Sequence, residues 1–201
     1  MHHATHFAQQ DPQALAEVIQ RFPLATLIMP SLDAHHVPML LQGSLAEGTA
    51  VLHGHVARAN SVWQREEKGD ALAIFHGPQA YITPSWYASK AEHGKVVPTW
   101  NYVVVHVRGT MTWIDDAAWK LDLVTRLTQQ QEADQSHPWQ VSDAPTEFID
   151  KLSSAIVGFE IRVSSMVGQF KLSQNRSAAD RAGVKAGLAE QSPALAMQIQ
   201  P

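Results

Sequence analysis

Alternation of apolar and polar residues is the main pattern along this chain, and it predicts a protein rich in β-strands. The clearest case is the stretch TWNYVVVHVRGTMTWI, where Val105 and Val107 point to one face and His106 and Arg108 to the other. Further strands are predicted at residues 24–30, 35–43, 49–59, 71–84 and 155–173. The strand at 71–84 is interrupted by Gly77–Pro78 in this prediction, and 155–173 holds one or two strands.

Helical spacing appears between these strands. Pro12 follows Asp11, a good N-cap, and opens an amphipathic helix. Trp119, Leu123 and Leu127 form one i, i+4 ladder on a later helix. Helices are predicted at residues 11–22, 60–70, 115–130, 147–152 and 177–191, with a loop or single helical turn at 85–95.

This order of elements favours a mainly β, α+β fold. Short connections between alternating strands predict a small β-barrel with peripheral helices instead of βαβ winding. We expect one domain over residues 1–201, with the helix at 177–191 near its C-terminal end. No GxGxxG or phosphate-loop motif follows a strand, which argues against a Rossmann-type dinucleotide site.

Composition narrows the functional classes. The 201 residues include no cysteine, so a disulfide framework and thiol catalysis are excluded. The first residues lack the features of a signal peptide, and no apolar run reaches the ~20 residues of a membrane span, so we expect a cytoplasmic protein without membrane association. A net charge of −4 and the lack of a helix-turn-helix pattern give no support to direct DNA binding.

The first candidate site is HGHVARAN. His53 and His55 share one strand face, but no third ligand is near, so we predict no metal site. Arg58 precedes a predicted helix start at Asn60, where unpaired N–H groups favour a phosphate or carboxylate. The alternative is an ordinary capped helix beside a solvent-exposed arginine.

The second candidate is YITPSWYASKAEHGKVVPTWNY, which mixes hydrogen-bond donors with flat apolar rings. Its donors are Thr83, Ser85, Lys90, Lys95 and Thr99, and its aromatic residues include Trp86, Tyr87, Trp100 and Tyr102. This mixture suits a planar ligand that carries a phosphate, although the rings could equally be core or dimer-interface anchors.

The third candidate is FKLSQNR. Lys171 completes a phosphate site in one interpretation and ends an ordinary strand in the other. No catalytic triad or paired carboxylate motif is recognised, so an enzyme of this kind would depend on a cofactor.

These three stretches, with VVVHVRG and GFEI, resemble the PaiB family of FMN-binding negative transcriptional regulators. The resemblance runs from about Phe7 to Leu188. It implies a split β-barrel of the flavin reductase and pyridoxamine phosphate oxidase type, a homodimer, and FMN in a groove between subunits. The family pattern has proline where Ser61 and Ala88 stand here, and neither change removes a charged or aromatic group.

From the residues and the resemblance together, we expect a set of cofactor-binding residues for FMN. They are His53, His55, Arg58, Asn60, Ser85, Trp86, Tyr87, Lys90, Thr99, Trp100, Asn101 and Lys171. The first functional hypothesis is an FMN-binding homodimer with the regulatory role that the family resemblance implies. The second is a flavin-dependent oxidoreductase that uses FMN and a nicotinamide donor, and the third is a DNA-binding repressor.

Overall fold

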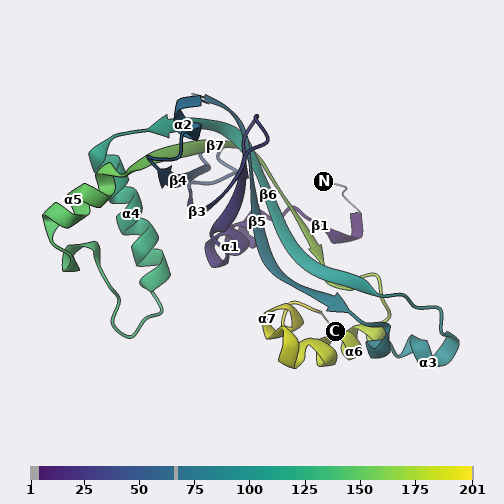
Figure 1. Ribbon diagram of the computed structural model, residues 1–201. Helices are drawn as coiled ribbons and strands as arrows, with labels where there is room; N and C mark the ends of the chain where they lie inside the picture. The colour runs from purple at the N-terminus through teal and green to yellow at the C-terminus, as the bar shows by residue number, and fades with distance from the viewer. Residues whose placement is uncertain (1–4, 66–67, 201) are drawn as a thin grey trace. The chain divides into compact units, whose positions relative to one another are not determined.

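The computed structural model describes residues 5–65 and 68–200 (Figure 1). Its strands are β1 (Ala8–Gln9), β2 (Leu24–Ile28), β3 (Ala34–Gln42), β4 (Val51–Ala57), β5 (Lys68–Ile82), β6 (Thr99–Ile114) and β7 (Ile156–Lys171). Its α-helices are α1 (Pro12–Arg21), α2 (Val62–Arg65), α3 (Ser89–His93), α4 (Ala117–Glu132), α5 (Thr146–Ser154), α6 (Ala178–Gln191) and α7 (Pro193–Ala196). Short 3-10 turns are η1 (Thr5–Phe7), η2 (Pro84–Trp86) and η3 (Val141–Asp143). None of the helices in this described part is long and apolar enough to cross a membrane.

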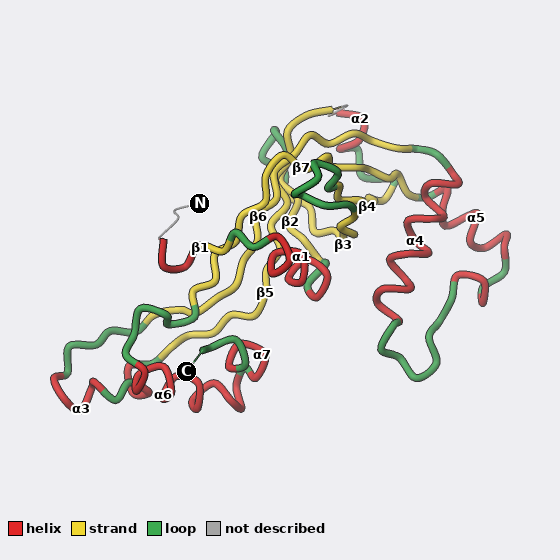
Figure 2. Tube along the Cα trace, turned by 180° about the vertical axis from the view of Figure 1, so that it is seen from behind, coloured by secondary structure: helices red, strands yellow, loops and turns green. Residues whose placement is uncertain are grey.

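The strands, coloured yellow in Figure 2, pair into a closed antiparallel barrel. Pairing runs in the order β7, β4, β3, β2, β5, β6, and β6 also pairs with β7. Gly109 lies at this closure, where an added Cβ would overlap the carbonyl oxygen of Arg162. The predicted barrel with peripheral helices is therefore confirmed, and β1 adds a short strand beside β7.

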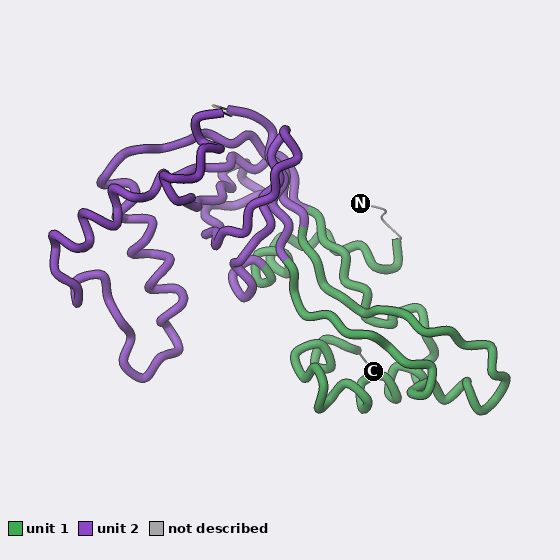
Figure 3. Tube along the Cα trace, viewed as in Figure 1, with its two compact units in different colours: residues 1–18, 76–105, 167–201 green, residues 19–75, 106–166 purple. Residues whose placement is uncertain are grey.

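Backbone contacts divide the chain into two compact units, coloured separately in Figure 3. Unit 1 comprises residues 1–18, 76–105 and 167–201, and unit 2 comprises 19–75 and 106–166. The long strands β5, β6 and β7 each contribute residues to both units. The two units are described separately below, and the single domain over 1–201 stays a prediction.

Unit 2 has an apolar interior and a second, smaller apolar layer. Leu52 and Val56 of β4 are buried, as their shared strand face predicts. Outside β3, the predicted ladder of α4 packs on Leu40: Leu123 and Leu127 are buried, and Trp119 lies against them. His53 on the opposite face of β4 is buried as well, and its ring contacts Trp119.

Two of the sequence-based predictions differ from the structure in where an element ends or breaks. The helix predicted at 60–70 is the single turn α2, and Gly69 belongs to β5 instead of ending a helix. The predicted positions Glu66 and Glu67 lie outside the described residues. β5 runs unbroken through Gly77–Pro78, because Gly77 leaves room for Val103 of β6: a Cβ there would lie 2.9 Å from the Cβ of Val103. The stretch 155–173 holds one strand, β7.

In unit 1, the helix α6 packs closely on η2. Gly183 and Gly187 lie on the side of α6 that meets Trp86, and added Cβ atoms would overlap the Trp86 carbonyl oxygen and indole ring, respectively. Ser177 caps the helix by accepting a hydrogen bond from the Asp180 backbone N–H. These two glycines therefore allow α6 to pack closely on η2.

Candidate functional site

The twelve predicted cofactor residues divide between the two units. His53, His55, Arg58 and Asn60 belong to unit 2, and the other eight belong to unit 1. We therefore describe two groups of polar side chains, each within its own unit.

In unit 2, Arg58 forms a clamp at the end of β4. Its Nε donates to the Ser154 carbonyl oxygen at 2.7 Å, and its Nη2 donates to the Asp115 carboxylate at 2.5 Å. Lys120 is buried and donates to the same Asp115 oxygen at 2.7 Å. Hydrogen bonds from Arg58 and Lys120 hold the pKa of Asp115 far below its usual range. The guanidinium thus already has protein partners. It joins the end of β4 to the residue that precedes α4 and to the backbone at the end of α5.

We expect Arg58→Ala to lower the melting temperature more than Arg65→Ala does. Arg65 forms an exposed ion pair with Asp33 and serves as the matched control, because exposed pairs contribute little. Because the pKa of Asp115 is lowered in the folded protein, its carboxylate stabilises the fold at pH 7. This stabilisation is lost as the pH falls from about 4, the ordinary pKa of aspartate, toward the lowered value. Thermal melts at neutral and acidic pH measure both effects, and equal shifts for the two variants at pH 7 would contradict the clamp.

His53 and Asn60 also have partners within unit 2. The His53 Nε2 lies 3.1 Å from Glu160, and its ring meets Trp119 edge to face. Burial lowers the pKa of His53, and the hydrogen bond and charge of Glu160 only partly offset this. The Asn60 side chain accepts from the Val62 N–H and contacts the ring of His35, so it forms the turn before α2.

His55 is different, because it faces a hollow. Its Nδ1 is buried without a hydrogen-bond partner among the described residues, and burial lowers the pKa of the ring. The hollow has a volume of about 360 Å³ and is lined mainly by apolar side chains. A neutral imidazole at an apolar hollow is suited to bind an uncharged group.

In unit 1, Lys171 lies at the centre of the second group. Its Nζ donates to the Thr99 hydroxyl at 2.5 Å and lies 5.9 Å from the centre of the Phe7 ring. Burial lowers the pKa of Lys171, and the positive charge of Arg176 lowers it further. Within residues 5–65 and 68–200, no carboxylate forms an ion pair with Lys171. A half-buried ammonium beside a hydroxyl and a second cation favours binding of an anion.

A chain of contacts leads from this lysine to α3. The Arg176 guanidinium lies 4.7 Å from the centre of the Tyr87 ring, over its face. Burial raises the pKa of Tyr87, and Arg176 partly opposes this. Ser89 donates its backbone N–H and its hydroxyl to Asp180 at 3.0 and 2.8 Å. Desolvation would raise the pKa of Asp180, but the hydrogen bonds from Ser89 and Ser177, with the charge of Arg176, outweigh it and hold that pKa below its usual value.

The remaining predicted residues of unit 1 have distinct roles. Lys90 donates to the Ser85 hydroxyl at 3.1 Å, which makes a second pair of a lysine and a hydroxyl. Trp100 is 53% exposed and meets Tyr81 edge to face. Asn101, by contrast, is fully buried and exchanges hydrogen bonds with Ser173, so it joins the strand ends and presents no surface to a ligand.

Sequence reasoning missed several partners of these residues. Asp115 and Asp180 are not among the predicted site residues, yet each accepts hydrogen bonds from a distant segment. The sequence around Glu160 does not indicate a role for this residue. Its role depends on the pairing of β4 with β7, in which His53 lies opposite Glu160. Strand register of this kind is not visible in the local sequence.

Residues 1–165 match the family model described as "Putative FMN-binding domain", so the chain belongs to this FMN-binding family. It is 32% identical to an uncharacterized protein of Emericella nidulans over 222 residues, which cover 90% of this chain and 87% of that protein. It is also 38% identical to the protease synthase and sporulation protein PAI 2 of Bacillus subtilis, over 63% of this chain and 59% of that protein. The resemblance to the PaiB family is thereby confirmed, and membership indicates FMN as the cofactor.

Solved structures confirm the fold. The flavocytochrome Anf3 from Azotobacter vinelandii matches with a TM-score of 0.59 at 13% identity, covering 90% of this chain and 78% of that one. A conserved hypothetical protein from Mycobacterium tuberculosis matches with a TM-score of 0.52 at 9% identity, covering 85% and 91% of the two chains. The predicted split β-barrel is confirmed by these likenesses, which concern the fold alone.

Proposed function

We propose that the protein binds FMN through Lys171 and Thr99, which hold the phosphate. The observation that supports this is the half-buried Lys171, which has a hydroxyl and a second cation beside it and no carboxylate partner in the described part of the chain. Phosphate oxygens accept hydrogen bonds from just these donor types. Lys90 with Ser85 is a second pair of the same chemistry, and Arg176 adds positive charge.

The two groups of predicted residues have different roles in this proposal. Ser85, Lys90, Thr99 and Lys171 bind the ligand, while Trp86, Tyr87 and Asn101 position the elements that carry them. Arg58 stabilises the end of β4 instead of meeting the phosphate, because its guanidinium is bonded to Asp115 and to backbone oxygens. Bound FMN would supply electron-transfer chemistry, and these side chains would fix its position.

A pH titration tests the phosphate site. We expect the ratio of FMN affinity to riboflavin affinity to rise from about pH 5 to 7, as the phosphate loses its second proton with a pKa near 6. The ratio should fall again on the alkaline side, because Lys171 loses its charge. Its lowered pKa places this fall below the usual value of 10.5. Fluorescence titration of both flavins measures the ratio, and a ratio that is independent of pH would contradict a charged phosphate site.

We further propose that the protein is a cytoplasmic homodimer with an indirect regulatory role. The name of the PAI 2 relative and the family resemblance support this, and the net charge of −4 argues against direct operator contacts. Size-exclusion chromatography with light scattering should give the mass of two chains. Electrophoretic mobility of promoter DNA at low salt should be unchanged by the protein, whereas a shift that weakens steeply with salt would favour a true repressor.

A further inference from the structure

Unit 2 has an apolar hollow at His55. Val124 of α4, Trp139, Ile149 of α5 and Ile156 of β7 supply apolar side chains to it. Trp139 is 44% exposed, so a large apolar side chain remains in contact with solvent here. Phosphate binding in unit 1 makes no use of this hollow.

The polar groups at this hollow are few and uncharged. They are His55, Thr128 and Ser153, and no Asp, Glu, Lys or Arg is among the residues that line it. Burial lowers the pKa of His55, so the ring is neutral at pH 7. An anion would lose its hydration here without gaining a cation, which disfavours it strongly. A neutral apolar molecule with a hydrogen-bonding group meets no such penalty.

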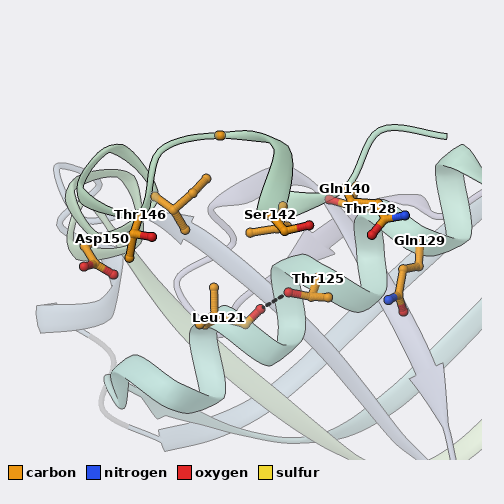
Figure 4. Close-up of a pocket in the computed structure, with 11 residues that line it drawn as sticks. Leu121, Thr125, Thr128, Gln129, Gln140, Ser142, Thr146 and Asp150 are labelled. Carbon is orange, nitrogen blue, oxygen red and sulfur yellow. Dashed lines mark hydrogen bonds between the residues drawn. The ribbon is translucent and has the colours of Figure 1, made fainter. Parts of the chain in front are cut away.

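A second hollow adjoins the first, and more of the residues that line it are polar. It has a volume of about 390 Å³ and shares Thr128, Val141 and Ile149 with the His55 hollow. Figure 4 shows its hydroxyl, amide and carboxylate side chains, drawn from α4, η3 and α5. The polar residues lining it are Thr125, Thr128, Gln129, Gln140, Ser142, Thr146 and Asp150. Asp150 is the one charged residue among those that line it, and it disfavours anions further.

We propose that these adjoining hollows bind an uncharged aromatic molecule with a hydrogen-bonding tail. The ring occupies the apolar hollow beside His55, and the tail meets the hydroxyl and amide groups between α4, η3 and α5. About 360 Å³ accommodates a molecule of two fused rings or more, within the usual range for small-molecule sites. The site shares no residue with the phosphate-binding group and selects against anionic ligands, FMN included.

N-phenyl-1-naphthylamine is a suitable probe, because it is neutral and fluoresces strongly in apolar surroundings. Its comparator, 8-anilinonaphthalene-1-sulfonate, carries the same ring systems and a sulfonate. We expect the neutral probe to bind with a 1:1 stoichiometry and the sulfonate to bind at least about tenfold more weakly. Saturating FMN should leave the neutral probe in place.

Substitutions that place a large side chain in the hollows test where the probe binds. Ile149→Trp on α5 and Val141→Trp on η3 should each weaken probe binding about tenfold or more. Phe148→Ser is the matched control on α5: Phe148 is 53% exposed and does not line either hollow, so binding should be unchanged. Circular dichroism of each variant establishes that the fold is retained. Equal binding to the filled variants, loss of binding in Phe148→Ser, or displacement by FMN would each overturn the proposal.

Discussion

Replacement of Gly183 by alanine should destabilise the protein by about 2–3 kcal/mol, the upper range for inserting a methyl group into a packed contact. Helix propensity alone predicts the opposite sign, because alanine in a helix interior is favoured over glycine by about 1 kcal/mol. The loss arises because the new Cβ would overlap the Trp86 carbonyl oxygen, which is backbone and cannot rotate away. Denaturant unfolding of Gly183→Ala and of the exposed control Ala182→Ser measures the difference.

A double-mutant cycle separates the two glycines of α6. A Cβ at Gly187 meets the Trp86 ring and not its backbone. Trp86→Ala should therefore relieve the effect of Gly187→Ala but leave the effect of Gly183→Ala nearly unchanged. If Gly183→Ala is neutral or stabilising, α6 does not pack on η2 as described.

Lys171→Met should weaken FMN binding by about 10- to 100-fold, since a hydrogen bond to a charged group contributes about 1.5–3 kcal/mol. Methionine keeps an unbranched side chain of nearly the same length but removes the ammonium group, which lies near the Phe7 ring. Riboflavin, which lacks the phosphate, should bind the variant and the parent protein about equally. Fluorescence quenching of each flavin gives both affinities.

Lys95→Met provides the control for general charge effects. Lys95 is an exposed lysine of the same unit, and its loss removes the same unit charge. We expect FMN affinity to change little in this variant. A similar loss in both variants would show that overall charge, and not a site at Lys171, governs binding.

Much of the fold could be predicted from the sequence, because burial of one face of a strand or helix gives its apolar residues a regular spacing. The alternation through Val103, Val105 and Val107 gave β6 its full length, and the ladder on α4 placed Leu123 and Leu127 correctly. The helix after β4 was overestimated, because the polar run there resembles a helix although the chain continues into β5. Such boundaries depend on strand pairing, which local composition does not encode.

The candidate site could be predicted less well, because its residues are brought together by long-range pairing that local composition does not encode. Lysines and hydroxyls stood out by type, but only the structure pairs Lys171 with Thr99, which lie 72 positions apart in the chain. The sequence likewise suggested that Arg58 was available to a phosphate, whereas Asp115 and two backbone carbonyl oxygens, those of Ser154 and Ile156, accept hydrogen bonds from it. Long-range partners decide which polar residues are free for a ligand.

The central claim is that this chain binds FMN through its phosphate, and a direct titration tests it most simply. Purified protein, freed of bound flavin and mixed with FMN, should quench flavin fluorescence at a stoichiometry of one FMN per chain. Riboflavin should bind markedly more weakly under the same conditions. Unquenched FMN at protein concentrations well above those of the flavin, or equal affinity for FMN and riboflavin, would contradict the account.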